Sequence, residues 1–352
     1  MKRNNELDCL RTIACFLVIV IHVSADFVVD NIEQYNLQFT AGNLFDSLSR
    51  ISVPLFVMLS GAFILGNNSN TNYGLFYKKS FNKILVPTLL WGIFYTIFSA
   101  IYLPKLSLLQ HFDFQYFSLV KGWFSGIPHY HLWYIFSTIG LYIITPVLIN
   151  LKNDIGEHKF FKLSIFILIL NIIIAANSSL YWMIEFSIYI GYFMLGYTLK
   201  NYSRNNNFSV KLSSFISLVS ILLIFILTEY FAKYNLFDKT LYFYKYLSPF
   251  VAIGAIFCFL TFLNIKMKYN YFENLSNHSF SIYLIHPLVL SFFQYYLLYF
   301  KIEVNAFWYI PVVAIIVFSL SYFLSIIISK ITATYFFKNI YRKIIFNTSH
   351  KL

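Results

Sequence analysis

The chain has 352 residues, of which 59% are hydrophobic, 21% are aromatic and only 11% are charged. An ordinary soluble domain carries about 25% charged residues, so this composition excludes a soluble enzyme. The formal net charge of +12 does not indicate nucleic-acid binding, because the lysines lie between apolar segments and not on one soluble face. We therefore expect membrane lipids as the surroundings and no nucleic acid as a partner.

Long apolar segments follow one another along the whole chain. A helix of about 20 residues crosses the roughly 30 Å hydrocarbon core of a bilayer. The sequence therefore predicts an all-α, polytopic membrane protein, with residues 1–352 forming a single transmembrane domain and no soluble extracytoplasmic domain. The ten predicted spans are Asp8–Val29, Asn43–Leu65, Lys79–Leu103, His131–Leu151, Lys159–Ala176, Tyr181–Leu199, Lys211–Lys233, Tyr244–Asn264, His278–Tyr299 and Ala306–Lys330.

The loops between these spans differ in charge. Ten spans put both termini on one side, and the termini and loops of that side hold 18 Lys and Arg residues, whereas the opposite loops hold six. Lys and Arg are enriched in cytoplasmic loops, so both termini are predicted to be cytoplasmic. The external loop 104–130 mixes aromatic residues with glycine and proline, which indicates a short interfacial segment.

The first predicted helix carries an unusual polar stripe. Its members recur at steps of three and four residues and so share one face: Asp8, Arg11, Cys15, Val18, His22 and Asp26. His22 lies about 21 Å along the helix from its start, in the external half, whereas Arg11 stays near the cytoplasmic end. Ionisable groups inside a membrane are costly and are functional candidates.

Asp26 follows His22 by one helical turn. A carboxylate in that place orients a histidine ring as a general base requires, so the sequence predicts His22 and Asp26 as catalytic residues. Two structural alternatives stay open: His22 bonded only to a neighbouring helix, and Arg11 paired with Asp8 or lipid phosphates instead of an anionic donor.

The second predicted helix runs inward and places Arg50 roughly 10 Å below the outer surface, near the depth of the first-helix histidine. There the guanidinium would hold an anionic group or stabilise an oxyanion, and we predict a catalytic role. A structural ion pair with Asp46, Asp26 or Glu185 explains the residue equally well.

Two further histidine motifs occur later in the chain. His286 lies near mid-membrane just before Pro287, where a missing backbone donor favours a cavity-lining kink, so His286 is a second catalytic candidate. Its alternative is a histidine bonded to the freed carbonyl. The motif HYHLWY contains His129 and His131, but two histidines without a third ligand are a weak metal signal. We predict an interfacial aromatic belt there and no metal site.

Six motifs in order resemble the acyltransferase-3 family of membrane O-acyltransferases, which includes surface-polysaccharide acetyltransferases. The most specific is Arg11 and His22, separated by ten residues. The motifs are LDCLRTIACFLVIVIHVSADF, SRISVPLFVMLSGAFIL, FYKKSFNKILVPTLLW, HLWYIFSTIGLYIITPVL, YIGYFMLGYTL and HSFSIYLIHPLV.

The resemblance implies catalysis by His22 with acetyl-CoA or another cytoplasmic acyl-CoA as donor. The implied acceptor is a carbohydrate hydroxyl of a surface polysaccharide or lipid-linked glycan, and the implied location is a bacterial cytoplasmic membrane. Arg11 would contact the CoA phosphates, with Lys78, Lys79 and Lys83 as further donor-binding candidates.

Two other functions compete with acyl transfer. A transporter or flippase for a polysaccharide or lipid-linked sugar would line its pathway with the same charged residues. It would not require the spacing between Arg11 and His22. A receptor or assembly scaffold would tolerate the loss of His22.

Overall fold

The computed structural model describes residues 4–110, 122–123, 129–176, 188–205, 208–236 and 240–333. Within these residues the chain is helical without β-strands, and nine helices are long and apolar enough to cross a membrane. The predicted all-α, polytopic membrane fold is therefore confirmed. The sixth predicted span, 181–199, falls partly outside the described residues, and its described part belongs to a helix of 16 residues, Ile190–Asn205.

Short π or 3-10 turns join some of the helices. A π-helical turn, η2 (Phe81–Leu85), links α4 to α5, so that Tyr73–Ile101 forms one candidate span. The α-helices are α1 (Asn5–Asn31), α2 (Leu37–Ser49), α3 (Ser52–Ile64), α4 (Tyr73–Ser80), α5 (Val86–Gln110), α7 (Trp133–Ile155), α8 (Glu157–Ala176), α9 (Ile190–Asn205), α10 (Val210–Lys233), α12 (Pro249–Asn264), α13 (Glu273–Phe300) and α14 (Ala306–Ala333).

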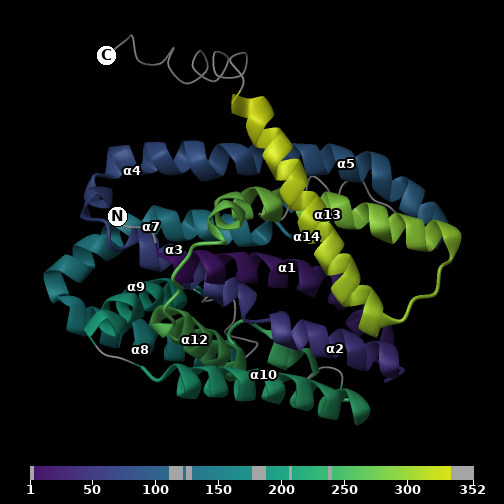
Figure 1. Ribbon diagram of the computed structural model, residues 1–352, viewed down its shortest axis with the longest axis horizontal. Coiled ribbons are helices and arrows are strands. Elements are labelled where there is room, and N and C mark those ends of the chain that lie inside the picture. The colour runs from purple at the N-terminus through teal and green to yellow at the C-terminus, as the bar shows by residue number, and fades with distance from the viewer. Residues whose placement is uncertain are drawn as a thin grey trace.

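Helix α1 lies in the middle of the bundle, between α5 along one edge and α10 along the other, while α14 crosses obliquely (Figure 1). It packs against α2, α3, α12, α13 and α14. Leu7, Leu10 and Ala14 are completely buried. The helix with the polar stripe is therefore enclosed by protein, which is where intramembrane ionisable groups are tolerated.

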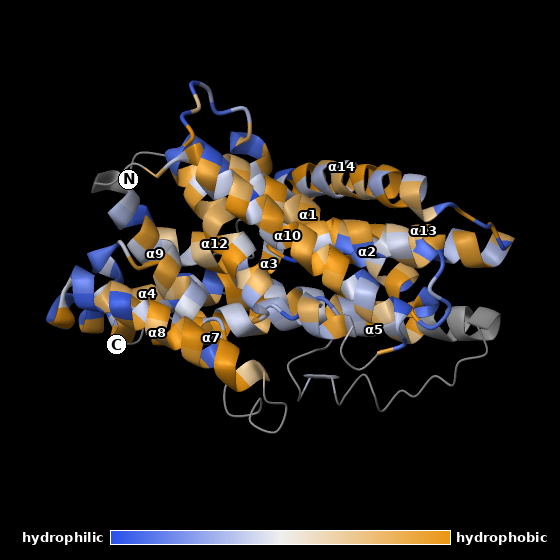
Figure 2. Cartoon of the chain, turned by 90° about the horizontal axis from the view of Figure 1, so that it is seen from below, coloured by the Kyte–Doolittle hydropathy of each residue, from blue (hydrophilic) through white to orange (hydrophobic). Residues whose placement is uncertain are grey.

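The outer helices present apolar side chains outward. Phe166, Ile173 and Phe215 are each more than 60% exposed, a pattern that suits lipid and not water. Hydrophobic residues run along α7, α8 and α14, and hydrophilic residues gather toward helix ends and loops (Figure 2). The protein is thus a multi-pass membrane protein whose outer helices present apolar sides to lipid.

The second predicted span is wrong in detail. The sequence predicts one helix over Asn43–Leu65, but the structure begins at Leu37 and has a break at Arg50 and Ile51 that separates α2 from α3. Hydropathy registers the apolar length of this segment but not the break. As a result Arg50 lies at a helix junction.

Helices α3 and α9 cross at two glycines. A Cβ atom on Gly61 would lie 1.7 Å from the carbonyl oxygen of Phe193, and a Cβ atom on Gly196 would lie 1.9 Å from that of Met58. Small residues allow such close backbone approach in membrane proteins, where van der Waals packing drives helix association. The crossing therefore fixes the position of α3, the helix that follows the break at Arg50.

Candidate functional site

The polar stripe of α1 faces α13, and the two helices run parallel. At the start of the pair Ser276 donates a hydrogen bond to Asp8 at 2.8 Å, and further along the Cys15 thiol contacts the Ser279 carbonyl at 3.5 Å. This alignment confirms that the stripe occupies one face. It also brings the two histidines predicted from separate motifs, His22 and His286, to the same level.

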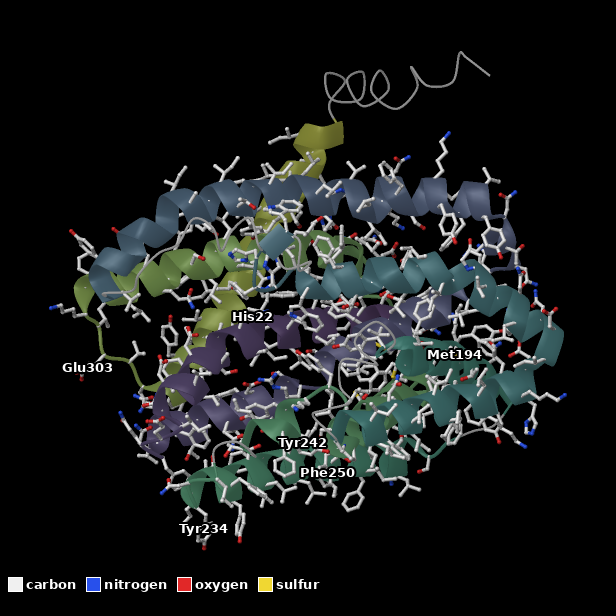
Figure 3. All side chains as sticks on the ribbon, turned by 180° about the vertical axis from the view of Figure 1, so that it is seen from behind. His22, Met194, Tyr234, Tyr242, Phe250 and Glu303 are labelled. Carbon is white, nitrogen blue, oxygen red and sulfur yellow. The ribbon has the colours of Figure 1, made fainter. Side chains whose placement is uncertain are left out.

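Four histidines and several tyrosines meet at that level. The His22 ring stacks on His286 with centroids 5.3 Å apart and meets the Tyr130 ring edge-on at 5.1 Å. His131 lies 5.6 Å from His286, and His129 lies 5.0 Å from His131. Figure 3 shows His22 deep among the helices, far from the loop residue Glu303. We call His22, His129, His131 and His286 the histidine cluster.

The prediction of an interfacial belt at HYHLWY is wrong for His131, which is completely buried. Its ring Nδ1 lies 2.9 Å from Nδ1 of His129, and its backbone carbonyl accepts a hydrogen bond from the Tyr283 hydroxyl. The Tyr95 hydroxyl ties α5 to α13 by donating to the Leu284 carbonyl at 2.6 Å. These contacts hold the backbone of His131 against α13 and its ring beside His129.

Several ring nitrogens of the cluster have no partner within the described part of the chain. They are Nε2 of His131 and both nitrogens of His286. The carbonyls of Ile282 and Tyr283 lie near the His286 ring, as the alternative of a bond to a freed carbonyl requires, but neither reaches a ring nitrogen with normal hydrogen-bond geometry. Buried polar atoms are nearly always bonded, so these nitrogens mark the histidine cluster as a candidate functional site.

The cluster is not arranged as a metal centre. Among the residues that the structure describes, no three His, Cys, Asp or Glu side chains are placed to hold a common metal ion. Stacked and edge-on rings direct their nitrogens differently, whereas zinc ligands converge tetrahedrally.

A first cavity of about 310 Å³ leads from the predicted cytoplasmic end toward the cluster. Arg11 and Lys83 line it, and Tyr283 forms part of its wall 5.6 Å from the His286 ring. Nη1 of Arg11 donates to the Ser276 hydroxyl at 3.5 Å, and its guanidinium lies 4.8 Å from the centre of the Phe63 ring. Of the four predicted donor-binding residues, Arg11 and Lys83 share this cavity.

The other two predicted donor-binding residues, Lys78 and Lys79, lie exposed on α4 and do not line the cavity. Lys79 precedes Lys83 by four residues, across the start of η2. Neither lysine therefore forms part of the wall of the cavity.

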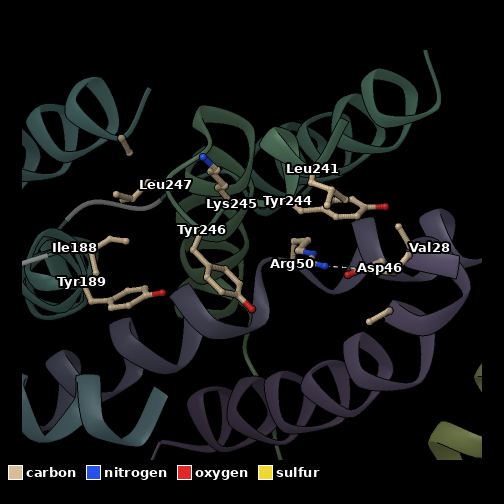
Figure 4. Close-up of a pocket in the computed structure, with 13 residues that line it drawn as sticks. Val28, Asp46, Arg50, Ile188, Tyr189, Leu241, Tyr244, Lys245, Tyr246 and Leu247 are labelled. Atoms are coloured by element: carbon tan, nitrogen blue, oxygen red, sulfur yellow. Dashed lines mark hydrogen bonds and ion pairs between the residues drawn. The ribbon is translucent and has the colours of Figure 1, made fainter. Parts of the chain in front are cut away.

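A second cavity of about 450 Å³ lies beyond the cluster along α1. Arg50 lines this cavity, and its Nη2 donates to Asp46 Oδ2 at 2.6 Å (Figure 4). Of the three ion-pair partners that the sequence offers for Arg50, Asp46 is therefore the one observed. Another proposed partner, Glu185, lies outside the described residues. Arg50 is close enough to His22 to act on it electrostatically.

Asp26 pairs with Gln294 and not with His22, the partner that the sequence predicts. Its Oδ2 accepts a hydrogen bond at 2.8 Å from Gln294 of α13. No Asp26–His22 hydrogen bond occurs among the described side chains. Asp26 also acts electrostatically on Tyr130, which stacks edge-on against the His22 ring. Any influence of Asp26 on His22 therefore passes through Tyr130 or through space.

A family model described as an acyltransferase domain matches residues 4–326, which includes α1, both cavities and the histidine cluster. The chain belongs to the acyltransferase-3 family. The resemblance carried by the six motifs is thereby confirmed, and the protein is a member of a membrane acyltransferase family.

Curated relatives cover most of the chain. Proteins of Staphylococcus aureus strains MSSA476 and MW2, each named "Probable poly-beta-1,6-N-acetyl-D-glucosamine export protein", are 25% identical over 311 residues, which span 82% of this chain and 83% of theirs. The counterpart from strain MRSA252 is 25% identical over 309 residues. No solved structure matches the chain.

Within this acyltransferase-3 protein, sequence analysis missed His131 and Tyr283 as parts of the site. The aromatic neighbours of His131 in the sequence favour an interfacial position. One sequence feature does favour a place in the site: His131 begins a predicted span at the external side, and His22 is predicted to lie in the same half of the membrane. Tyr283 carries no such signal, because one tyrosine among 29 is not distinctive.

Proposed function

We propose that this protein is a membrane O-acyltransferase that moves an acyl group, with acetyl as the first to test, from cytoplasmic acyl-CoA to a sugar hydroxyl of a surface polysaccharide or lipid-linked glycan. The observation that carries the proposal is the place of His22 between two cavities. Along α1, Arg11 lines the first cavity about 16 Å before His22, and Ala25 lines the second one turn after it.

The donor would occupy the first cavity. Arg11 and Lys83 supply positive charge at its wall, which suits the phosphates of CoA, and Lys78 and Lys79 add charge at its approach. The π-helical turn that holds Lys83 is a feature often found at functional sites. An acyl thioester directed past Tyr283 would reach the histidine cluster.

In the proposed chemistry neutral His22 takes the proton of the acceptor hydroxyl as its oxygen attacks the thioester carbonyl. The tetrahedral oxyanion collapses, the carbon–sulfur bond breaks, and the CoA thiolate takes the proton from the imidazolium. An N–H of His131 or His286 is available to the oxyanion, because both rings have unpartnered nitrogens. An acyl-histidine relay on His22 fits the same geometry.

The bacterial cytoplasmic membrane is the location we propose, with the donor side in the cytoplasm. The asymmetry of Lys and Arg along the chain supports this orientation, because the end of α1 that carries Arg11 lies on the positive side. The acceptor would then approach from outside, through the cavity that contains Arg50.

Export of a glycan is the second candidate function. It is supported by the printed name of the staphylococcal relatives, which are 25% identical to this chain. An exporter would use the two cavities as parts of one path and would form no covalent bond. It gives no role to unpartnered histidine nitrogens at the junction, so acyl transfer is our first choice.

The test is transfer of label from acyl-labelled acetyl-CoA into membrane glycans. We compare wild-type protein with His22→Ala and with a matched control, His158→Ala, which removes an exposed histidine. General acid–base catalysis contributes about 10²–10⁴-fold, so we expect His22→Ala to reduce labelling at least 100-fold and His158→Ala to leave it unchanged.

Two outcomes would contradict acyl transfer. One is undiminished labelling with His22→Ala protein present at the wild-type level. The other is no wild-type labelling with several acyl-CoA donors and glycan acceptors, while glycan still reaches the outer face only when the protein is present; that result would assign export instead.

A further inference from the structure

The second cavity is lined by aromatic rings around one ion pair. Tyr189, Tyr244 and Tyr246 contribute their rings, and Arg50 with Asp46 forms an ion pair in the wall (Figure 4). Lys245 also lines the cavity, but its ammonium points away from the ion pair (Figure 4). The guanidinium of Arg50 lies 4.3 Å from the centre of the Tyr244 ring. A volume of about 450 Å³ is within the range of small-molecule sites.

The ion pair leaves one donor and one acceptor without partners. Nη2 of Arg50 and Oδ2 of Asp46 bond to each other at 2.6 Å, but Nε of Arg50 and Oδ1 of Asp46 are buried and unpartnered among the described residues. Asp46 is only 1% exposed, so bulk water does not solvate it. The two atoms therefore call for a ligand that both accepts and donates hydrogen bonds.

Charge decides which ligand class fits. The carboxylate of Asp46 neutralises Arg50, so an anionic ligand would satisfy Nε but would be repelled by Oδ1, and an ammonium would have the opposite conflict. A hydroxyl accepts from Nε and donates to Oδ1 without conflict. Aromatic walls suit the faces of a sugar ring, because the weakly positive C–H groups meet the negative faces of the tyrosine rings.

The walls of the cavity are held in place from behind. The Tyr244 hydroxyl donates to Asn43 Oδ1 at 2.5 Å, and Asn43 in turn donates to Glu229 at 2.8 Å. The Tyr192 hydroxyl bonds to the Tyr246 carbonyl at 2.6 Å. These bonds preorganise the aromatic walls around the ion pair, which reduces the entropy lost when a ligand binds.

We propose that this cavity binds an uncharged sugar through adjacent hydroxyls, one accepting from Nε of Arg50 and one donating to Oδ1 of Asp46, with the tyrosine rings against the sugar faces. The inference rests on the proposed function, because it identifies this sugar as the acceptor. It also makes Arg50 a binding residue. The sugar would lie beside Ala25, one turn from His22 on α1.

The experiment measures binding without any acyl-CoA. Purified full-length protein in nanodiscs is titrated with a panel of neutral disaccharides of hexoses and N-acetylhexosamines, with singly deoxygenated analogues of the best binder, and with a uronic-acid disaccharide. We expect the neutral sugar to bind, removal of either of two adjacent hydroxyls to weaken affinity about tenfold, and the uronic acid to bind more weakly. Because the wild-type protein is used, misfolding cannot explain the result.

Matched variants locate the binding. Asp46→Asn keeps the shape of the side chain, and we expect it to weaken neutral-sugar binding about tenfold or more. Lys233→Met removes an exposed cation in the last turn of α10, outside the wall of the cavity, and we expect it to leave that binding unchanged. Each variant is first compared with wild-type protein by thermal denaturation, and the deoxygenated analogues carry the test where Asp46→Asn is unstable.

Three outcomes would overturn the proposal: no neutral sugar of the panel binds at millimolar concentration, the uronic acid binds more tightly, or Lys233→Met weakens binding while Asp46→Asn does not. The labelling assay separates this proposal from acyl transfer. Label transfer without neutral-sugar binding refutes the sugar site alone, and neutral-sugar binding without label transfer refutes the acyltransferase function alone.

Discussion

The crossing of α3 and α9 leaves no room for a methyl group. In Gly61→Ala the new Cβ would lie 1.7 Å from the Phe193 carbonyl oxygen, and in Gly196→Ala it would lie 1.9 Å from the Met58 carbonyl oxygen. Carbon and oxygen in van der Waals contact are about 3.3 Å apart. The helices would therefore have to separate by roughly 1.6 Å in Gly61→Ala, because a backbone carbonyl has no rotamer to change.

The expected cost follows from this overlap. Overpacking a core typically costs about 1–3 kcal/mol and occasionally more. We expect each substitution at the crossing to reach about 3 kcal/mol, since neither helix can relieve the overlap by moving a side chain. The gain of about 0.5–1 kcal/mol from replacing a helical glycine by alanine offsets little of it.

Gly140 of α7 provides the matched control. It is exposed, and a Cβ atom there would meet nothing within 4 Å, so Gly140→Ala should be neutral or slightly stabilising. The assay heats detergent-solubilised protein and measures the fraction that stays monodisperse by size-exclusion chromatography. Gly61→Ala and Gly196→Ala should aggregate at clearly lower temperatures than Gly140→Ala. Equal thermal stability of all three would refute the close crossing.

Two further predictions concern single polar groups. Lys152 is only 5% exposed, and its Nζ donates at 2.9 Å to the carbonyl of Leu65, the C-cap residue of α3. Lys152→Met should therefore lower stability by about 1–3 kcal/mol in the same heating assay, whereas Lys211→Met, at an exposed lysine, should have no measurable effect. Equal stability of the two variants would show that the bond is dispensable. Asp26 bonds to Gln294, so Asp26→Asn should reduce label transfer less than tenfold. A loss as large as that of His22→Ala would instead support the pairing that the sequence predicts.

The break at Arg50 shows a limit of hydropathy. The apolar length of the second span predicted a membrane helix, and a helix pair is present there. However, hydropathy does not record the effect of Pro54, which has no N–H to donate to the carbonyl of Arg50 four residues earlier and whose ring clashes with that carbonyl. The proline is therefore the local signal for the break at Arg50 and Ile51. The ion pair with Asp46 was among the alternatives because i and i+4 are neighbours on any helix.

The sequence by itself determined what depends on composition and on the period of one helix. Apolar lengths specify membrane spans, and steps of three and four residues place Arg11 and His22 on one face, since both follow from helix geometry. Only the tertiary structure decided that this face meets His286 and His131, and that His22 lies between two cavities. Such contacts join residues far apart in the chain, and packing in the membrane depends on the fit of whole helices, which no local pattern records.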